Sequence, residues 1–156
     1  MNRTGEIKGE MKEKELTQYD FPMGYAVCFN SECTQKEKCL HHQAYLLRRD
    51  GWTSGPAIYP DAWKDGQCKR YSENLLVRKA WGFSRIYDNM PHYKRAEAHR
   101  CVMNYFSAGC GPYYRYHHGE NKLTPRQQQD IMDILALFGP TDGLAFDHYE
   151  MDFNFD

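Results

Sequence analysis

The clearest hydrophobic pattern in the chain follows Thr124 and has the spacing of an α-helix. Its apolar side chains recur at intervals of three and four residues: Ile131, Ile134, Leu135 and Phe138. The run Thr124-Pro125-Arg126-Gln127 is a capping box with proline at the first helical position, and Gly139-Pro140 ends the pattern. We therefore predict a helix over residues 125–138.

Two further segments have helical character. Pro91 suits the first position of a helix over residues 91–106, whose apolar stripe consists of Ala96, His99, Val102, Met103 and Phe106. A helix over residues 34–49 would bury its Ala44 to Leu47 side and end at Asp50-Gly51. The polar segment that precedes this second helix contains Cys28 and Cys33.

Other segments predict strands and loops. Residues 113–117 are rich in tyrosine, as strands often are, whereas residues 75–87 fit neither the helical nor the strand period. Residues 51–73 hold several Gly and Pro with aromatic rings between them, which favours an ordered loop. The last segment, 146–153, alternates rings and acids and is expected to fold back over the core.

These elements predict the α+β class, with three main helices and a short sheet in a single small domain over residues 19–156. Residues 1–18 carry few large apolar groups and are predicted to form a flexible arm. No apolar run approaches the roughly 18 residues that a membrane span needs, so we expect a soluble protein without membrane contact. No secretory signal precedes the cysteines, which predicts a cytoplasmic location.

Charge is unevenly distributed although the net charge is only −1. Residues 69–126 hold eleven Lys and Arg against four Asp and Glu, a balance of +7, and residues 139–156 hold five acids and no Lys or Arg. Aromatic residues make up 15% of the chain, with 12 Tyr. A basic middle with interleaved rings suits nucleic acid, and exposed tyrosines suit a protein partner.

Four cysteines form the strongest chemical pattern. Cys28, Cys33 and Cys39 are separated by four and five residues, and Cys68 follows the loop rich in Gly and Pro. Structural zinc commonly uses pairs with two to four residues between the cysteines, so this spacing is at or beyond the zinc range. The four residues predict a thiolate metal site, with zinc as the expected ion and an iron–sulfur cluster as the alternative.

Two other interpretations of the cysteines compete with a metal site. Buried thiols are common in cores, but the segment around Cys33 is polar; disulfides require an oxidising compartment, which the absence of a signal segment disfavours. His41 and His42 could supply the last ligand if Cys68 does not. Cys101 and Cys110 are predicted to lie outside the site.

Catalytic signatures are missing from the sequence: it has no nucleophile elbow, phosphate-binding glycine loop or H-E-x-x-H motif. His117-His118 is best explained as an exposed turn. A binding or regulatory protein, stabilised by metal, is therefore favoured over an uncharacterised enzyme. The residues with the best composition for contacting nucleic acid or a protein partner are Arg95, Arg100, Tyr113, Tyr114, Arg115 and His117.

Several motifs resemble a family of small Bacteroidales proteins known only as a domain of unknown function. They comprise the run from Phe21 through Cys28, Cys33 and Cys39-Leu40, together with Tyr113-Tyr114-Arg115, Leu123-Thr124-Pro125 and Phe146-Asp147-His148-Tyr149. The stretch from Cys33 to Ala44 also resembles, locally, the C-x5-C-L segment of WhiB-type iron–sulfur proteins. That second resemblance implies a cysteine-bound cluster but differs in the position of the fourth cysteine.

Overall fold

The computed structural model describes residues 14–107 and 109–155, which divide into two compact units. The first unit ends at Ser72 and the second begins at Glu73. The predicted flexible arm lies mostly outside the described residues; within it, Lys14 forms an ion pair of 3.1 Å with Asp20. One globular domain over residues 19–156 stays a prediction.

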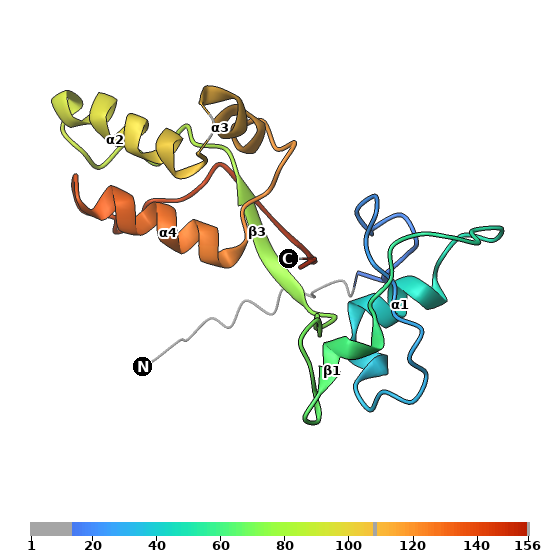
Figure 1. Ribbon diagram of the computed structural model, residues 1–156. Helices are drawn as coiled ribbons and strands as arrows, with labels where there is room; N and C mark the ends of the chain where they lie inside the picture. Colours follow the sequence, from blue (N-terminus) through green and yellow to red (C-terminus); the bar gives the residue numbers. More distant parts are fainter. Residues whose placement is uncertain (1–13, 108, 156) are drawn as a thin grey trace, which may run out of the picture. The chain divides into compact units, whose positions relative to one another are not determined.

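The first unit is built mainly of loops around one short helix (Figure 1). A 3₁₀ turn, η1 (Lys36–Lys38), precedes α1 (Leu40–Leu46), and η2 (Pro60–Ala62) precedes the strands β1 (Trp63–Lys64) and β2 (Gln67–Cys68). The two strands pair in antiparallel fashion, with Trp63 opposite Cys68. Asp65 and Gly66 connect them with φ values of 54° and 76°, as expected for the Asp-Gly turn of a two-residue hairpin.

The helix predicted over residues 34–49 is shorter in the structure and begins later. Cys39 has extended backbone angles (φ −98°, ψ 121°) and donates its N–H to the Lys36 carbonyl, so it stands at the N-cap of α1 and not inside a helix. The Leu40 N–H donates to the carbonyl of Ser72, 2.7 Å away. These bonds outside the helix explain why the helical pattern is interrupted before Leu40.

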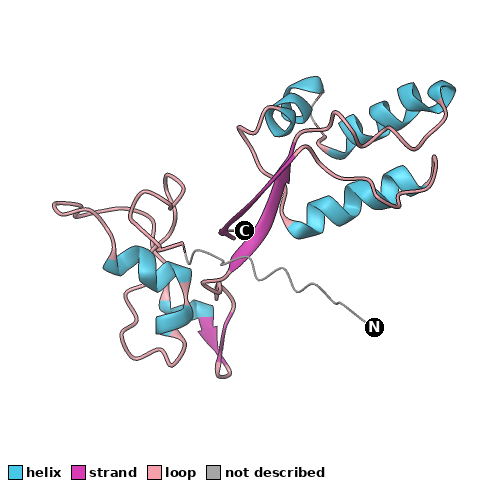
Figure 2. Cartoon of the chain, turned by 180° about the vertical axis from the view of Figure 1, so that it is seen from behind, coloured by secondary structure: helices cyan, strands magenta, loops and turns pink. Residues whose placement is uncertain are grey.

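The second unit combines three helices with a two-stranded sheet (Figure 2). β3 (Leu76–Trp81) and β4 (His148–Phe153) pair in antiparallel register from Leu76 opposite Phe153 to Trp81 opposite His148. α2 (His92–Tyr105) packs against α4 (Pro125–Ala136) and against α3 (Cys110–His117). The fully buried side chains at their centre include Phe83, Ile86, Val102, Leu123, Ile131 and Leu135.

The α+β class is confirmed, and α2 and α4 match the helices predicted over residues 91–106 and 125–138. Thr124 and Gln127 make both bonds of the predicted capping box. The last segment folds back as β4, whose Glu150 and Asp152 pair with Lys122 and Lys79. The described residues hold four α-helices and two short sheets where we predicted three main helices and one sheet.

The strand predicted over residues 113–117 is wrong, because these residues form the C-terminal part of α3. Gly109 turns the chain with a φ of 76°, and Gly111 and Pro112 occupy the first turn of the helix, where no intrahelical N–H bond is needed. Tyr113 and Tyr116 therefore reach the core at helical spacing, whereas Tyr114 is exposed. Within the described residues, no helix has both the length and the apolar composition to cross a membrane.

Candidate metal centre

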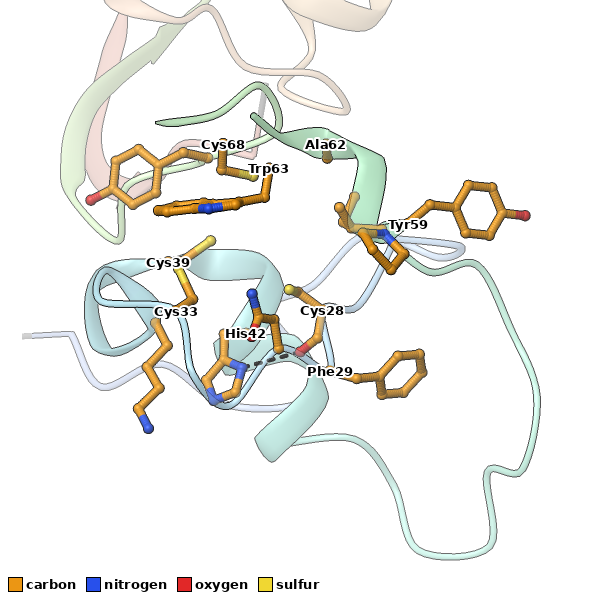
Figure 3. A pocket seen from close by; sticks show the side chains of 14 residues that line it. Cys28, Phe29, Cys33, Cys39, His42, Tyr59, Ala62, Trp63 and Cys68 are labelled. Atoms are coloured by element: carbon orange, nitrogen blue, oxygen red, sulfur yellow. Dashed lines mark hydrogen bonds between the residues drawn. The ribbon is translucent and has the colours of Figure 1, made fainter. Parts of the chain in front are cut away.

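All four cysteines predicted as metal ligands line one pocket in the first unit (Figure 3). The pocket has a volume of about 430 Å³. Cys28 and Cys33 come from the loop before α1, Cys39 from the N-cap of α1, and Cys68 from β2. The fold thus collects thiols that lie up to forty residues apart in the sequence.

Hydrogen bonds from α1 hold the Cys28 segment at the pocket. The Cys28 N–H donates to the His41 carbonyl at 2.9 Å. The Cys28 carbonyl in turn lies 3.1 Å from Nδ1 of His42, and a neutral ring that donates from Nδ1 has its lone pair on Nε2. Cys28 is therefore fixed to the helix through both its N–H and its carbonyl.

The two histidines behind Cys39 have different surroundings although both are 6% exposed. His42 lines the pocket. His41 does not line it: its ring stacks on Tyr25 with centroids 4.6 Å apart, and its Nδ1 lies 2.6 Å from the Ala26 carbonyl. Burial lowers the pKa of His41, opposed by the Ala26 hydrogen bond and aided by the nearby charge of Arg70. Of these two alternative ligands, His42 is the one placed at the pocket.

The four thiols share the pocket without converging on one point. Within residues 14–107 and 109–155, no three His, Cys, Asp or Glu side chains are grouped as they would be around a metal ion. Figure 3 shows the indole ring of Trp63 across the pocket, between Cys68 and Cys39 in that view. Binding one ion with all four thiols would require the side chains to turn inward.

The remaining wall of the pocket is largely apolar and aromatic. Its apolar and aromatic residues are Phe29, Ile58, Tyr59, Pro60, Ala62, Trp63 and Tyr71, and Asn30 is a further polar lining residue. Lys36 supplies a positive charge at the pocket, and its Nζ donates to the Ser31 carbonyl. Sequence reasoning missed this wall, although the Asp65-Gly66 turn signal would have placed Trp63 opposite Cys68.

Cys101 and Cys110 belong to the second unit, on α2 and at the first position of α3. Neither lines the cysteine pocket, and all six cysteines are free thiols. The two residues therefore offer matched controls for substitutions at the pocket.

The residues predicted to contact nucleic acid or a protein partner divide into an exposed group and a packed group. Arg95, Arg100, Tyr114 and Arg115 are exposed on α2 and α3. Tyr113 is 4% exposed; its hydroxyl lies 3.0 Å from that of Tyr87, and burial raises the pKa of both.

His117 is half-buried and has a structural partner. Its Nδ1 accepts the Phe83 N–H at 3.0 Å, which leaves the proton of the neutral ring on Nε2. Tyr113 and His117 therefore support the core of the second unit, and only the exposed group is available for a partner.

The fold and the pocket define a small α+β protein with a cysteine-lined cavity. The chain belongs to a family of unknown function, DUF6078, whose model matches residues 11–155. This match confirms the resemblance to a domain of unknown function. No curated protein and no solved structure matches the chain.

Proposed function

We propose that the chain is a metal-binding protein in which Cys28, Cys33, Cys39 and Cys68 hold a thiolate-bound metal centre. The observation that carries the proposal is their meeting in one pocket from three separate segments. Four thiols are a complete ligand set both for a zinc ion and for an iron–sulfur cluster. Zinc is the ion we expect from the sequence.

The surroundings of the pocket fit such a centre. Metal-binding residues are usually supported by hydrogen bonds from a second layer of residues, and His41 and His42 give the Cys28 backbone that support. Lys36 would offset part of the negative charge that thiolates bring. The ligands must remain reduced, which supports our proposal that the protein works in the cytoplasm.

In this proposal the centre stabilises or regulates a binding protein and is not a catalyst. Exposed cations and rings on the second unit support a partner that is a protein or a nucleic acid. These are the side chains of Arg95, Arg100, Tyr114 and Arg115. Cations would pair with phosphates and the tyrosine ring would stack on a base or pack against a protein surface.

The proposal is tested by the melting temperature of Cys33→Ser, with Cys101→Ser as the matched control. A metal that binds only the folded state, at a free concentration one hundred times its dissociation constant, adds about 2.7 kcal/mol to the free energy of unfolding. For a unit of this size we expect Cys33→Ser to melt roughly 10 to 20 °C lower than the wild type. Cys101→Ser should melt like the wild type.

A strong chelator should lower the melting temperature of the wild type and of Cys101→Ser but leave that of Cys33→Ser unchanged. If the two serine variants lose equal stability and chelator changes neither the wild type nor the control, the cysteines have only a packing role. That result would refute a metal centre.

A further inference from the structure

The cysteine pocket is larger than one ion requires. A zinc ion binds each of four sulfurs at about 2.3 Å, which brings the sulfurs to within roughly 3.8 Å of one another. The pocket that the four cysteines line together with other residues has a volume of about 430 Å³. A water molecule takes up only about 30 Å³ in the liquid, so the pocket could hold a group of many atoms.

We infer that this pocket holds a four-iron, four-sulfide cluster in preference to a single zinc ion; this inference rests on the proposed metal-binding function. In such a cluster each cysteine binds a different iron, so the four sulfurs do not have to meet at one centre. The arrangement of Cys28, Cys33, Cys39 and Cys68 around a broad pocket suits that requirement. The wide spacing of the first three cysteines suits it as well.

The wall of the pocket favours the same conclusion. Burial and the exclusion of water protect and tune iron–sulfur clusters. Ile58 and Trp63 line the pocket beside the thiols, and none of the lining residues is Asp or Glu, whereas the rings of Phe29 (58% exposed) and Tyr59 (78% exposed) point away from the cysteines (Figure 3). Trp63 is 37% exposed, and its ring lies between Cys68 and Cys39 in Figure 3, so it borders the space that a cluster would occupy.

The cluster would enter the pocket by an exchange of thiolate ligands, in which bonds and charges balance. An assembled cluster arrives from a donor with thiolate ligands, the four cysteine thiols each lose a proton, and four new Fe–S bonds replace the four bonds to the donor. No electron is transferred in this step. The four thiolates that form donate electron pairs to the irons, the thiolates of the donor are released, and the four protons pass to solvent or to those released thiolates.

The experiment uses the full chain, produced with iron available and purified without oxygen. We expect about four irons and four sulfides per chain and a brown protein with broad absorption near about 400 nm. One zinc per chain without iron would overturn the cluster and leave the proposed function intact. A chain with neither metal would overturn the proposed function itself.

A second measurement tests where the cluster lies. Trp63→Ala should speed the loss of colour in air several-fold, because it removes part of the wall. Trp52→Ala is the matched control, since Trp52 is 61% exposed in the same unit and does not line the pocket. Equal bleaching of the two variants would contradict a cluster beneath Trp63. The metal content and spectrum of the wild type are measured first, so the inference can still be refuted if the Trp63→Ala variant fails to fold.

Discussion

Gly82→Ala tests how the end of β3 is joined to the segment before β4. Gly82 has a φ of +85°, and a Cβ placed there lies 2.6 Å from both Cβ and Oδ2 of Asp147. The Asp147 carboxylate accepts hydrogen bonds from the Ser84 N–H (3.0 Å) and hydroxyl (2.7 Å). An alanine at this position must therefore adopt a disfavoured backbone conformation and also displace a side chain that makes two bonds.

The expected loss of stability follows from these two costs. A left-handed alanine costs about 1 to 2 kcal/mol, and two lost hydrogen bonds cost about 0.5 to 1.5 kcal/mol each, so Gly82→Ala should lower the free energy of unfolding by about 2 to 5 kcal/mol. Gly143→Ala is the matched control, because Gly143 has a φ of +74° but no described atom lies within 4 Å of a Cβ placed there. It should lose only about 1 to 2 kcal/mol.

Urea unfolding measures the difference between the two variants. Trp81 reports on the second unit when Trp52 and Trp63 are both replaced by Phe, since the chain has three tryptophans. If Gly82→Ala and Gly143→Ala lose the same free energy, the close approach of Asp147 to Gly82 has no energetic consequence. That result would refute the reasoning.

Two predictions concern charge in the second unit. Burial would raise the pKa of Asp147, but the Ser84 bonds and the nearby His117 and His148 outweigh it and hold the pKa below its usual value. A carboxyl with a lowered pKa stabilises the fold at pH values above its unfolded pKa, and this stabilisation is lost as the pH falls through its folded pKa. In urea unfolding, Asp147→Asn should therefore show its full loss of free energy of unfolding relative to the wild type at pH 7, and this loss should shrink below about pH 4. A loss that does not depend on pH would contradict the prediction. Binding to a random single-stranded nucleic-acid pool should fall by orders of magnitude between about 50 and 200 mM salt, and the slope should flatten when three cations are replaced together. No retention at low salt would leave a protein as the partner. The three cations are Arg95, Arg100 and Arg115.

The sequence predicts best where one local signal decides the structure. The capping box at Thr124 and the apolar stripe behind it specify α4, and Pro91 marks the start of α2 to within one residue. The prediction fails at residues 113–117, where tyrosine content favours a strand. Tertiary packing decides there, because a helix beginning at Cys110 buries Tyr113 against Phe83 and Phe106.

At the candidate site, too, the features that depend on tertiary packing could not be predicted from the sequence. The spacing of Cys28, Cys33 and Cys39 indicates a shared site, and the pocket brings them together with Cys68. The aromatic wall is not visible in the sequence, since residues 51–73 look like a loop and the rings reach the cysteines only through the hairpin of β1 and β2. The choice between His41 and His42 also depends on which face of α1 meets the pocket.

The most direct test of a metal centre on the four cysteines is the intact mass of the folded full-length chain, measured by native mass spectrometry without oxygen. We predict that the wild type and Cys110→Ala carry the mass of a metal centre in addition to the chain. Alanine at Cys28, Cys39 or Cys68 should remove that added mass. A wild-type chain of bare polypeptide mass, or added mass that persists in all three pocket variants, would contradict the account.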